Sequence, residues 1–519
     1  MRHLEVIDYG VIAVYFALTA FIGFSATRRA TSSDDLFLAG RSLGPVVVGF
    51  SLFASNISSD TLVGLPGAAY RNGISASNYE WMAGVVLVFT AIFVLPVLMR
   101  SRVATMPEFM ERRFDWRLRR YLSVITLFLS IILDTAGTLY AGSLVLSIFI
   151  PGLALWQACW VLALFTALYT ACGGLRAVVY ADILQALVLL GGSACLAIIM
   201  FGHFDYSWSV LTARVDANKL SLIRPLDDPG VPWLGLVTGL PIVGFYYWTM
   251  NQYVVQRILG ARNAATAGRA ALFAALLKLL PIFLMTIPGA MASVLLPGLA
   301  QPDQVYPAMV SAFAPTGIRG LILAGLMAAL MSTVSATLNS AATLVALDFV
   351  QPARPRLTSS QLAWVGRVAT LFIALIAAAW APMIQHFAGL WGYLQQVFAF
   401  VASPLVATFL MGLWVARLGS SAALRGLVCG HVLSAVCFVL YQAGIVHLHF
   451  TVLGGVLCAA TALMTWAWMR VLRDRDQPDG QGREILSHAR FNLAGMPRDV
   501  LWGCAAVLVL TGVIVVALR

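Results

Sequence analysis

Charged residues are scarce in this sequence: they make up 11% of its 519 residues, where a soluble globular domain carries roughly 25%. The hydrophobic share is 60% and the mean hydropathy is +0.87. With so few charges the chain cannot cover a water-exposed surface, which excludes the soluble classes. We therefore expect an integral membrane protein whose main surroundings are the lipid bilayer.

Lysine is almost absent as well, since only Lys219 and Lys278 occur among 33 basic residues. A net charge of +11 is typical of nucleic-acid-binding proteins, but here the arginines lie in short loops between apolar runs. That distribution is the one found in the cytoplasmic loops of membrane proteins. We expect no nucleic-acid partner.

Features of enzymes and of disulfide-bonded proteins are also missing. The seven cysteines lie in or beside apolar runs, are odd in number and lack the spacing of metal ligands. No HExxH sequence, nucleophile elbow or phosphate-binding loop stands at the edge of an apolar run. The sequence predicts neither an enzyme nor an organic cofactor.

Apolar runs long enough to cross a bilayer, about 20 residues each, recur along the whole chain. We expect an all-α integral membrane protein with about fourteen transmembrane helices. Two runs, 43–71 and 306–346, are long and interrupted by polar residues, as in a broken or extended helix. The expected spans are 5–26, 43–71, 77–99, 118–149, 154–172, 176–201, 233–250, 270–296, 306–346, 362–381, 388–415, 422–441, 447–470 and 499–518.

The arginines orient these spans in the membrane. Arginine-rich loops alternate with poorer ones, the 202–232 loop being the main exception. Because arginine-rich loops stay cytoplasmic, both termini are expected on the extracellular or periplasmic side of the cell membrane. The first run lacks a cleavage signature, so we expect a retained span there. The cytoplasmic arginines include Arg28, Arg29, Arg41, Arg100, Arg112, Arg113, Arg119, Arg257, Arg262, Arg354, Arg417 and Arg425.

Two apolar runs carry helix-breaking residues in similar patterns. The polar stretch Asn56–Thr61 is followed by the sequence GLPG, and 239–251 reads GLPIVGFYYWTMN. Glycine and proline loosen a helix and free backbone groups, which a membrane tolerates only against protein or a wet cavity. Since the two stretches lie five spans apart, we expect two inverted five-helix repeats, 43–201 and 233–415, each opening with a broken helix. Proline-kinked packing helices are the alternative.

Hydroxyl side chains gather in the run at 329–348, which contains the adjacent residues Ser332 and Thr333. Hydroxyls in membrane helices usually bond their own backbone or a neighbouring helix. Beside a broken helix they also suit a hard cation such as sodium, which prefers oxygen ligands. The pattern therefore admits a sodium site without a buried carboxylate.

Four charged residues, Glu80, Asp134, Asp182 and Lys278, fall inside the expected spans. A charge at mid-bilayer costs roughly 2.5–3.5 kcal/mol, so such residues should face a cavity or an opposite charge. Glu80 stands near the start of its span, so its side chain could equally lie at the membrane–water interface instead of facing a cavity. Lys278 lies deeper in its span, so a polar pocket suits it better than snorkelling to the surface.

These residues stand in stretches that resemble the sodium/solute symporter family, and its sodium–sugar cotransporter branch in particular. The resemblance covers about 50–350 and continues more weakly through YLQQ and SP at 393–404. The stretches are SLFASNIS, GLPG, YEWMA, TMPEFMERRF, LYTACGGLRAVVYADILQ, YYWTMNQYVVQR, LLKLLPIFLMTIPGAM and LMAALMSTVSATLNSAATLVALD.

The resemblance implies a LeuT-like fold of two inverted five-helix repeats around a central site that opens alternately to each side. Outside the repeats, 1–42 is expected to be an extra helix and loop, and 202–232 an extracellular loop. Residues 416–519 should form extra C-terminal helices, with a charged cytoplasmic loop at 470–498.

The resemblance further implies one sodium ion at the break of the first helix. Asp182 matches an acidic residue near the exit path of the ion. Ser335 matches one hydroxyl of a second sodium site found in some members, but Ala336 stands where another hydroxyl would be, so one sodium per cycle is expected. The implied ligands are the carbonyls of Ala54, Ile57 and Ala329 and the hydroxyls of Ser332 and Thr333.

For the solute, the resemblance places Glu80, Lys278 and Gln395 around the hydroxyls of a sugar. Tyr247 would stack on the sugar as an inner gate, and Asn56 would orient the unwound segment. Thr61 is also a substrate-binding position. Thr61, Ala83 and Gly244 stand where bacterial sugar-binding relatives carry larger or more polar residues, which leaves room for inositol or another polyol.

We therefore expect sodium-coupled symport of a neutral sugar such as glucose or galactose by alternating access. The alternatives are sodium-coupled symport of a polyol, a monocarboxylate or an amino acid, or a channel or sensor. A sensor usually carries a large soluble signalling domain, and the segment at 470–498 is too short for one.

Overall fold

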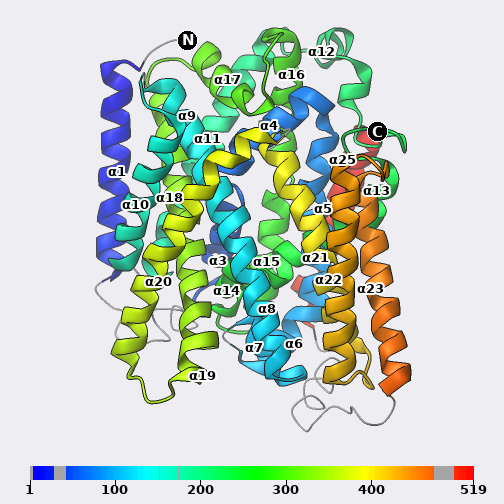
Figure 1. Ribbon diagram of the computed structural model, residues 1–519. Coiled ribbons are helices and arrows are strands. Elements are labelled where there is room, and N and C mark those ends of the chain that lie inside the picture. The colour runs from blue at the N-terminus through cyan, green and yellow to red at the C-terminus, as the bar shows by residue number, and fades with distance from the viewer. Residues whose placement is uncertain are drawn as a thin grey trace.

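The computed structural model of the protein describes residues 4–27, 42–103, 105–150, 152–172, 175–387, 389–472 and 496–519. These ranges form a bundle of helices without a β-strand (Figure 1). The first half contains α1 (Val6–Thr27), α3 (Pro45–Asn56), α4 (Ser59–Asn72), α5 (Asn78–Phe89), α6 (Leu95–Ser101), α7 (Met106–Arg113), α8 (Trp116–Leu129), α9 (Ala136–Phe149), α10 (Leu155–Cys172), α11 (Leu175–Gly202) and α12 (Trp208–Arg214). The second half contains α13 (Trp233–Phe245), α14 (Gln252–Leu259), α15 (Ala264–Leu277), α16 (Ile287–Leu295), α17 (Val305–Phe313), α18 (Ile318–Leu344), α19 (Gln351–Ala353), α20 (Ser359–Trp380), α21 (Leu390–Trp414), α22 (Ser420–Gln442), α23 (Phe450–Leu472) and α25 (Arg498–Ala517).

Fewer helices than the expected fourteen meet the length and composition of a membrane span in the part of the chain that the structure describes. In the described ranges, ten helical segments are long and apolar enough to cross a membrane, and the bent pair α3–α4 makes eleven. The expected spans 5–26, 154–172 and 233–250 coincide with α1, α10 and α13. The uninterrupted parts of α1 and α10 whose side chains the structure describes, Val6–Thr19 and Leu155–Leu168, are apolar but shorter than a full span. The structure thus supports a multi-pass helical membrane protein, but not the count of fourteen.

The first broken helix lies where the sequence predicts it. α3 and α4 meet at an angle of 58° across the two residues Ile57 and Ser58. The sequence GLPG, however, is not the cause of the break, because these residues lie inside α4. Gly67 instead allows close packing, since a Cβ atom there would come within 2.3 Å of the Pro302 carbonyl oxygen.

The second broken helix is interrupted later than its glycines and proline suggest. α13 runs through Pro241 and continues as a π-helical segment, Tyr246–Met250, before Asn251 adopts an extended conformation ahead of α14. Gly239 serves the packing of α13 on α23, because a Cβ atom would lie 1.7 Å from the Thr451 carbonyl oxygen. Both breaks therefore fall beside polar residues, Ser58 and Asn251, rather than at glycine or proline.

The run at 306–346, which the sequence marks as a broken or extended helix, is divided into two helices. Residues Val305–Phe313 form the short helix α17, and the long helix α18 starts only at Ile318. Between them Gly317 has a φ of +86°, a left-handed conformation that glycine adopts without steric cost. The Asp8 carboxylate of α1 accepts hydrogen bonds from the backbone N–H groups of Gly317 (2.8 Å) and Gly320 (2.9 Å) and so caps α18.

Wide π-helical turns interrupt several long helices, and three of them lie at or near Asp134, Tyr247 and Lys278. Asp134 lies in Ser130–Thr135, Tyr247 lies in Tyr246–Met250, and Lys278 precedes Ile282–Thr286 by a few residues. π-helical turns are frequent at functional sites.

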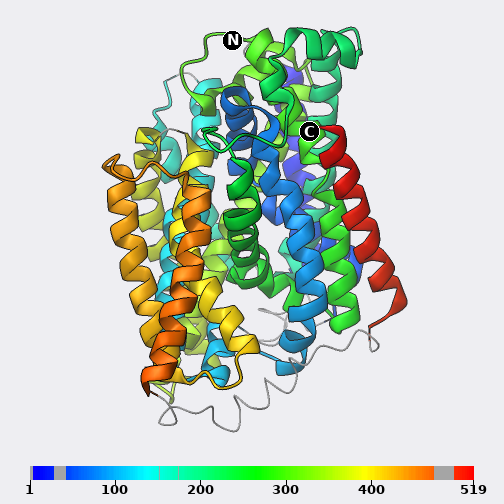
Figure 2. The ribbon, with the colours of Figure 1, turned by 90° about the vertical axis from the view of Figure 1, so that its right-hand side faces the viewer.

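The C-terminal helix α25 packs on the outside of α5 and α15 (Figure 2). Glycines permit the close approach, because a Cβ atom at Gly503 would lie 2.9 Å from Leu272, and one at Gly84 would lie 3.4 Å from Val507. At the opposite side of the bundle, α1 lies against α11 and α18. The start of α1 and the end of α25 lie at the same end of the molecule in both views.

The first arginine-rich loop, with Arg28, Arg29 and Arg41, lies outside the described residues. So does 473–495, which forms most of the loop expected at 470–498.

Candidate functional site

The break in the first helix leaves carbonyl groups without partners in their own helix. The last four carbonyls of an α-helix have no intrahelical donor. In α3 the Phe53 oxygen accepts from the Ile57 N–H at 2.9 Å, and the Asn56 oxygen accepts from the Thr61 hydroxyl at 2.8 Å. Ala54 and Ile57, whose carbonyls are two of the predicted sodium ligands, are buried at this break.

Helix α18 brings the predicted hydroxyl ligands to the same region, since it packs against both α3 and α4. The Thr333 side chain is 2% exposed, and its hydroxyl oxygen has no hydrogen-bond partner. Ala329, one turn earlier, is fully buried. A buried hydroxyl without a partner is costly, about 1–3 kcal/mol, which a cation bound beside it would offset. The oxygen set fits a sodium ion.

Ser332 is linked to the first broken helix through Asp182 of α11. The Ser332 hydroxyl donates to one oxygen of this carboxylate, and the Ser51 hydroxyl of α3 donates to the other at 2.6 Å. Ser51 precedes Ala54 by less than one helical turn. Asp182 therefore holds Ser332 near the carbonyl end of α3. By contrast, Ser335 accepts a hydrogen bond from Thr170 at 2.9 Å, away from this network.

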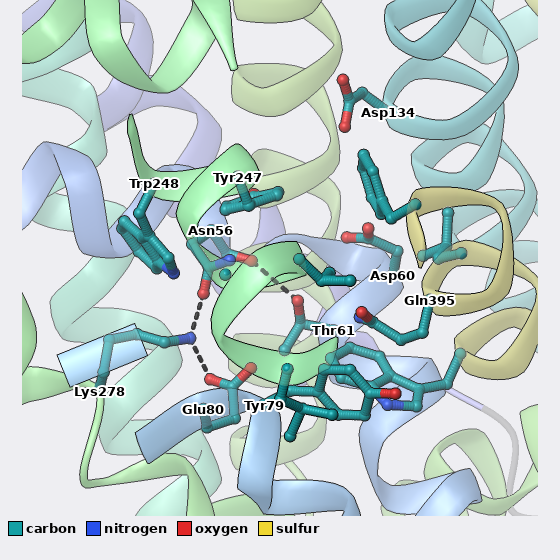
Figure 3. Close-up of a pocket in the computed structure, with 16 residues that line it drawn as sticks. Asn56, Asp60, Thr61, Tyr79, Glu80, Asp134, Tyr247, Trp248, Lys278 and Gln395 are labelled. Atoms are coloured by element: carbon teal, nitrogen blue, oxygen red, sulfur yellow. Dashed lines mark hydrogen bonds and ion pairs between the residues drawn. The ribbon is translucent and has the colours of Figure 1, made fainter. Parts of the chain in front are cut away.

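A polar pocket lies beside the break and contains all six of the predicted substrate-binding residues (Figure 3). Its walls come from both broken helices and from α5, η4 at Ser130–Thr135, α15 and α21. The lining residues are Asn56, Asp60, Thr61, Tyr79, Glu80, Asp134, Leu240, Val243, Gly244, Tyr247, Trp248, Lys278, Trp391, Leu394, Gln395 and Phe398.

Lys278 is paired within this pocket. Its ammonium donates to the Glu80 carboxylate and to the Asn56 side-chain oxygen, and it lies 5.6 Å from the centre of the Trp248 ring (Figure 3). The side chains of Lys278 and Glu80 are 1% and 5% exposed. A buried pair of this kind avoids the cost of an isolated charge, and it presents donors and acceptors together to a solute. Neither residue is at the lipid interface.

Aromatic rings close the pocket on two sides. Tyr79 and Trp391 form an edge-to-face pair with ring centres 5.7 Å apart, and both also line a larger cavity of about 590 Å³ beyond the pocket. Tyr247 lies on the opposite side (Figure 3), where its hydroxyl bonds that of Tyr253. The pocket thus has aromatic rings on two sides, and Tyr79 and Trp391 together with Gln395 line both the pocket and the larger cavity.

The structure adds pocket residues that sequence reasoning did not assign. Asp60 and Asp134 point into the pocket from α4 and η4 (Figure 3), and Trp248 and Trp391 supply further aromatic surface. Asp134 is a charged residue inside an apolar run, and this position indicates a pocket residue from the sequence alone. Nothing in the sequence around the two tryptophans indicates that they line a pocket. Ala83 is buried outside the pocket lining.

Two of the predicted positions have additional structural roles. The Thr61 hydroxyl donates to the Asn56 carbonyl across the break, so only its lone pairs remain for a solute. Gly244 lines the pocket, and a Cβ atom there would lie 3.2 Å from Val86, which leaves little space for a larger residue.

A membrane helix bundle with two broken helices and a polar pocket beside one of the breaks is the arrangement of a secondary transporter. The model of the sodium:solute symporter family matches residues 36–430. The sodium/mannose cotransporter of Bos taurus is 34% identical, over 95% of this chain and 90% of its own length. The sodium/glucose cotransporter of Vibrio parahaemolyticus is 33% identical, over 82% of this chain and 84% of its own length. The mouse sodium/myo-inositol cotransporter is also 33% identical, over 84% of this chain and 67% of its own length.

Solved structures give the same fold. A sodium-coupled sialic acid symporter, in a substrate-bound outward-open state, matches with a TM-score of 0.77 at 23% identity, over 92% of this chain and 99% of that chain. A nucleobase–cation symporter in a closed conformation matches with a TM-score of 0.56 at 15% identity, over 88% of this chain and 99% of that chain. The chain belongs to the sodium:solute symporter family, whose members are transporters rather than enzymes.

Proposed function

We propose that this protein takes up a neutral sugar or polyol together with one sodium ion. The observation that carries the proposal is the pocket in which Glu80, Lys278 and Asn56 form one hydrogen-bonded group next to the break at Ile57 and Ser58. A hydroxyl-rich solute needs donors, acceptors and an aromatic face together. The relatives named for glucose, mannose and myo-inositol carry solutes of this chemical class.

The charges of the pocket favour a neutral solute over an anion. Lys278 is already neutralised by Glu80. Asp60 lies in the first turn of α4, where the positive end of a half-helix would otherwise attract an anionic group. Asp60 and Asp134 also line the pocket, and neither offers a cation to a monocarboxylate.

The sodium ligands in this proposal are the carbonyls of Ala54, Ile57 and Ala329 and the hydroxyls of Ser332 and Thr333. Sodium would join the end of α3 to α18 and so complete the adjoining pocket, whose first wall is Asn56. The unpartnered Thr333 hydroxyl supports this assignment. Asp182 would act near the exit path of the ion.

Alternating access would arise from movement of two repeats, 43–201 and 233–415, around the fixed site. The pair Tyr79 and Trp391 would open toward the larger cavity, and Tyr247 would yield toward the cytoplasm. The remaining segments, 1–42, 202–232 and 416–519, lie outside this core. Both termini would be extracellular or periplasmic, which the shared position of the ends of α1 and α25 supports.

One sodium ion supplies enough free energy for this cycle. Inward movement of one charge at −100 mV contributes about 2.3 kcal/mol, and a tenfold sodium gradient adds about 1.4 kcal/mol. Together these sustain an accumulation on the order of several hundredfold.

The test is a panel of radiolabelled solutes in proteoliposomes, with an inward gradient of sodium or of choline. We expect sodium-dependent, saturable uptake of glucose, galactose, mannose or myo-inositol, and no competition by monocarboxylates or amino acids. Gln395→Leu should abolish this uptake because Gln395 faces the pocket. Gln396→Leu is the matched control, since Gln396 lines only the larger cavity and bonds Gln442 at 3.1 Å. Uptake blocked by a monocarboxylate and insensitive to all four of these solutes would reject the proposal.

A further inference from the structure

Arg257 is a buried charge that the solute pocket does not use. It lies in α14, the second half of the second broken helix, and its side chain is 1% exposed. The guanidinium donates to the Tyr253 carbonyl at 2.6 Å and to the Ser51 hydroxyl at 2.9 Å, and it lies 3.4 Å from the Asp182 carboxylate. An arginine buried among membrane helices needs such a partner because an isolated charge there is costly.

Asp182 stands between this arginine and the proposed sodium ligands. One carboxylate oxygen accepts from Ser51 and faces Arg257, while the other accepts from Ser332. Asp182 itself is fully buried. Since the Ser332 proton is directed to Asp182, the lone pairs of the Ser332 oxygen stay available to a cation. A continuous polar chain therefore runs from Arg257 through Ser51 and Asp182 to Ser332.

We propose that Arg257 is a positioning residue that acts as the internal counter-cation of the sodium site. Its charge neutralises Asp182, so that sodium is held by neutral oxygens alone and the carboxylate does not become a further ligand. Asp182 keeps its role of orienting the Ser332 hydroxyl. The inference rests on the sodium site proposed above, and it explains how a carboxylate one hydroxyl away from that site leaves sodium free to dissociate inward.

Removing the charge of Arg257 should therefore strengthen sodium binding. Coulomb attraction between sodium and an uncompensated Asp182 is long-ranged in a medium of low dielectric constant. Arg257→Gln should lower the half-saturating sodium concentration at least threefold and slow the release of bound sodium. Arg257→Lys keeps the charge and should stay within twofold of the wild type. Arg257→Gln combined with Asp182→Asn removes both charges and should lose the gain.

A purely structural role predicts a different pattern. If Arg257 only tied α14 to α3, its loss would reduce stability without tightening sodium binding. Arg113→Gln is a matched control for the loss of a buried arginine, because Arg113 is 1% exposed and donates to the backbone oxygens of Gly412, Val415 and Leu418 at the end of α21. It should leave the sodium midpoint unchanged.

The measurement is equilibrium binding and release of radioactive sodium on the purified full-length protein, without sugar, at pH 8. A wild type without saturable sodium binding would overturn the proposed sodium site itself. A wild type that binds sodium, together with an Arg257→Gln variant that binds it equally or more weakly, would overturn the role of Arg257 alone. Should Arg257→Gln fail to fold, Ser51→Ala removes the hydrogen-bonded link but no charge. It should lower the sodium midpoint about twofold, and an unchanged or higher midpoint would overturn the inference.

Discussion

The substitution Thr333→Val tests whether Thr333 is a sodium ligand or only a packing residue, because the two roles predict different effects on sodium binding. Valine keeps the volume of threonine but lacks its hydroxyl. That hydroxyl is buried and has no hydrogen-bond partner, and such a group costs about 1–3 kcal/mol. In the absence of sodium, the variant should therefore unfold at the same temperature as the wild type or at a higher one.

Sodium binding should change in the other direction. A hydroxyl ligand to a cation is comparable with a hydrogen bond to a charged group, about 1.5–3 kcal/mol. Losing it should raise the half-saturating sodium concentration by roughly 10- to 150-fold. Sodium should also stabilise the variant against heat far less than it stabilises the wild type.

Thr343→Val is the matched control on the same helix. Thr343 is equally buried, but its hydroxyl donates to the Asn339 carbonyl at 2.8 Å. Its replacement should cost about 1 kcal/mol of stability and leave the sodium midpoint unchanged. Thermal unfolding of the purified protein at a series of sodium concentrations measures both effects. An unchanged sodium midpoint in Thr333→Val would refute the assignment of this hydroxyl as a ligand.

Three further outcomes are expected. Glu80→Gln should destabilise the protein by about 3–5 kcal/mol because it leaves Lys278 buried without a counter-charge. Adding Lys278→Gln should restore thermal stability but not uptake. A double variant as unstable as the single one would contradict the pairing. Asp134→Asn should raise the KM for sugar about tenfold or more, because it weakens an acceptor of hydrogen bonds from the solute hydroxyls. The half-saturating sodium concentration should not change. An unchanged KM in proteoliposome uptake would show that Asp134 does not bind the solute. Burial lowers the pKa of His449 to about 4, so stability that is full above about pH 6.5 should be lost as the pH falls toward 4, by about 3 kcal/mol in all. His449→Gln should flatten this dependence in thermal unfolding curves, and a variant with the wild-type slope would count against it.

The sequence predicts the polar part of the site better than the helix boundaries. Asn56, Glu80 and Lys278 were notable because polar residues inside apolar runs are costly unless they meet a partner, and the structure brings these three together. The polar residues around Ile57 also predict the break there, since polar side chains can form hydrogen bonds with the backbone groups that a break leaves unpaired. Gln395 and Tyr247 depended on the resemblance to a family, because nothing local distinguishes them from neighbouring residues.

Other features could not be derived from local sequence because they depend on tertiary contacts. Glycine within an apolar run marks either a break or a close approach of two helices, and Gly67 and Gly239 proved to be close approaches. Gly317 proved to be a true break, which divided the expected span at 306–346. Asp60 was a visible polar residue whose direction became clear only once α4 was placed against α21.

The docking of α25 (Arg498–Ala517) allows this helix to affect the solute pocket although it lines no part of it. This helix covers α5, which carries Glu80, and α15, which ends directly before Lys278. It therefore separates the buried ion pair of Glu80 and Lys278 from the acyl chains of the lipids. Without α25, lipid acyl chains would contact α5 and α15 directly and would lie closer to this ion pair. The environment of the pair would then change although every residue that lines the pocket was still present.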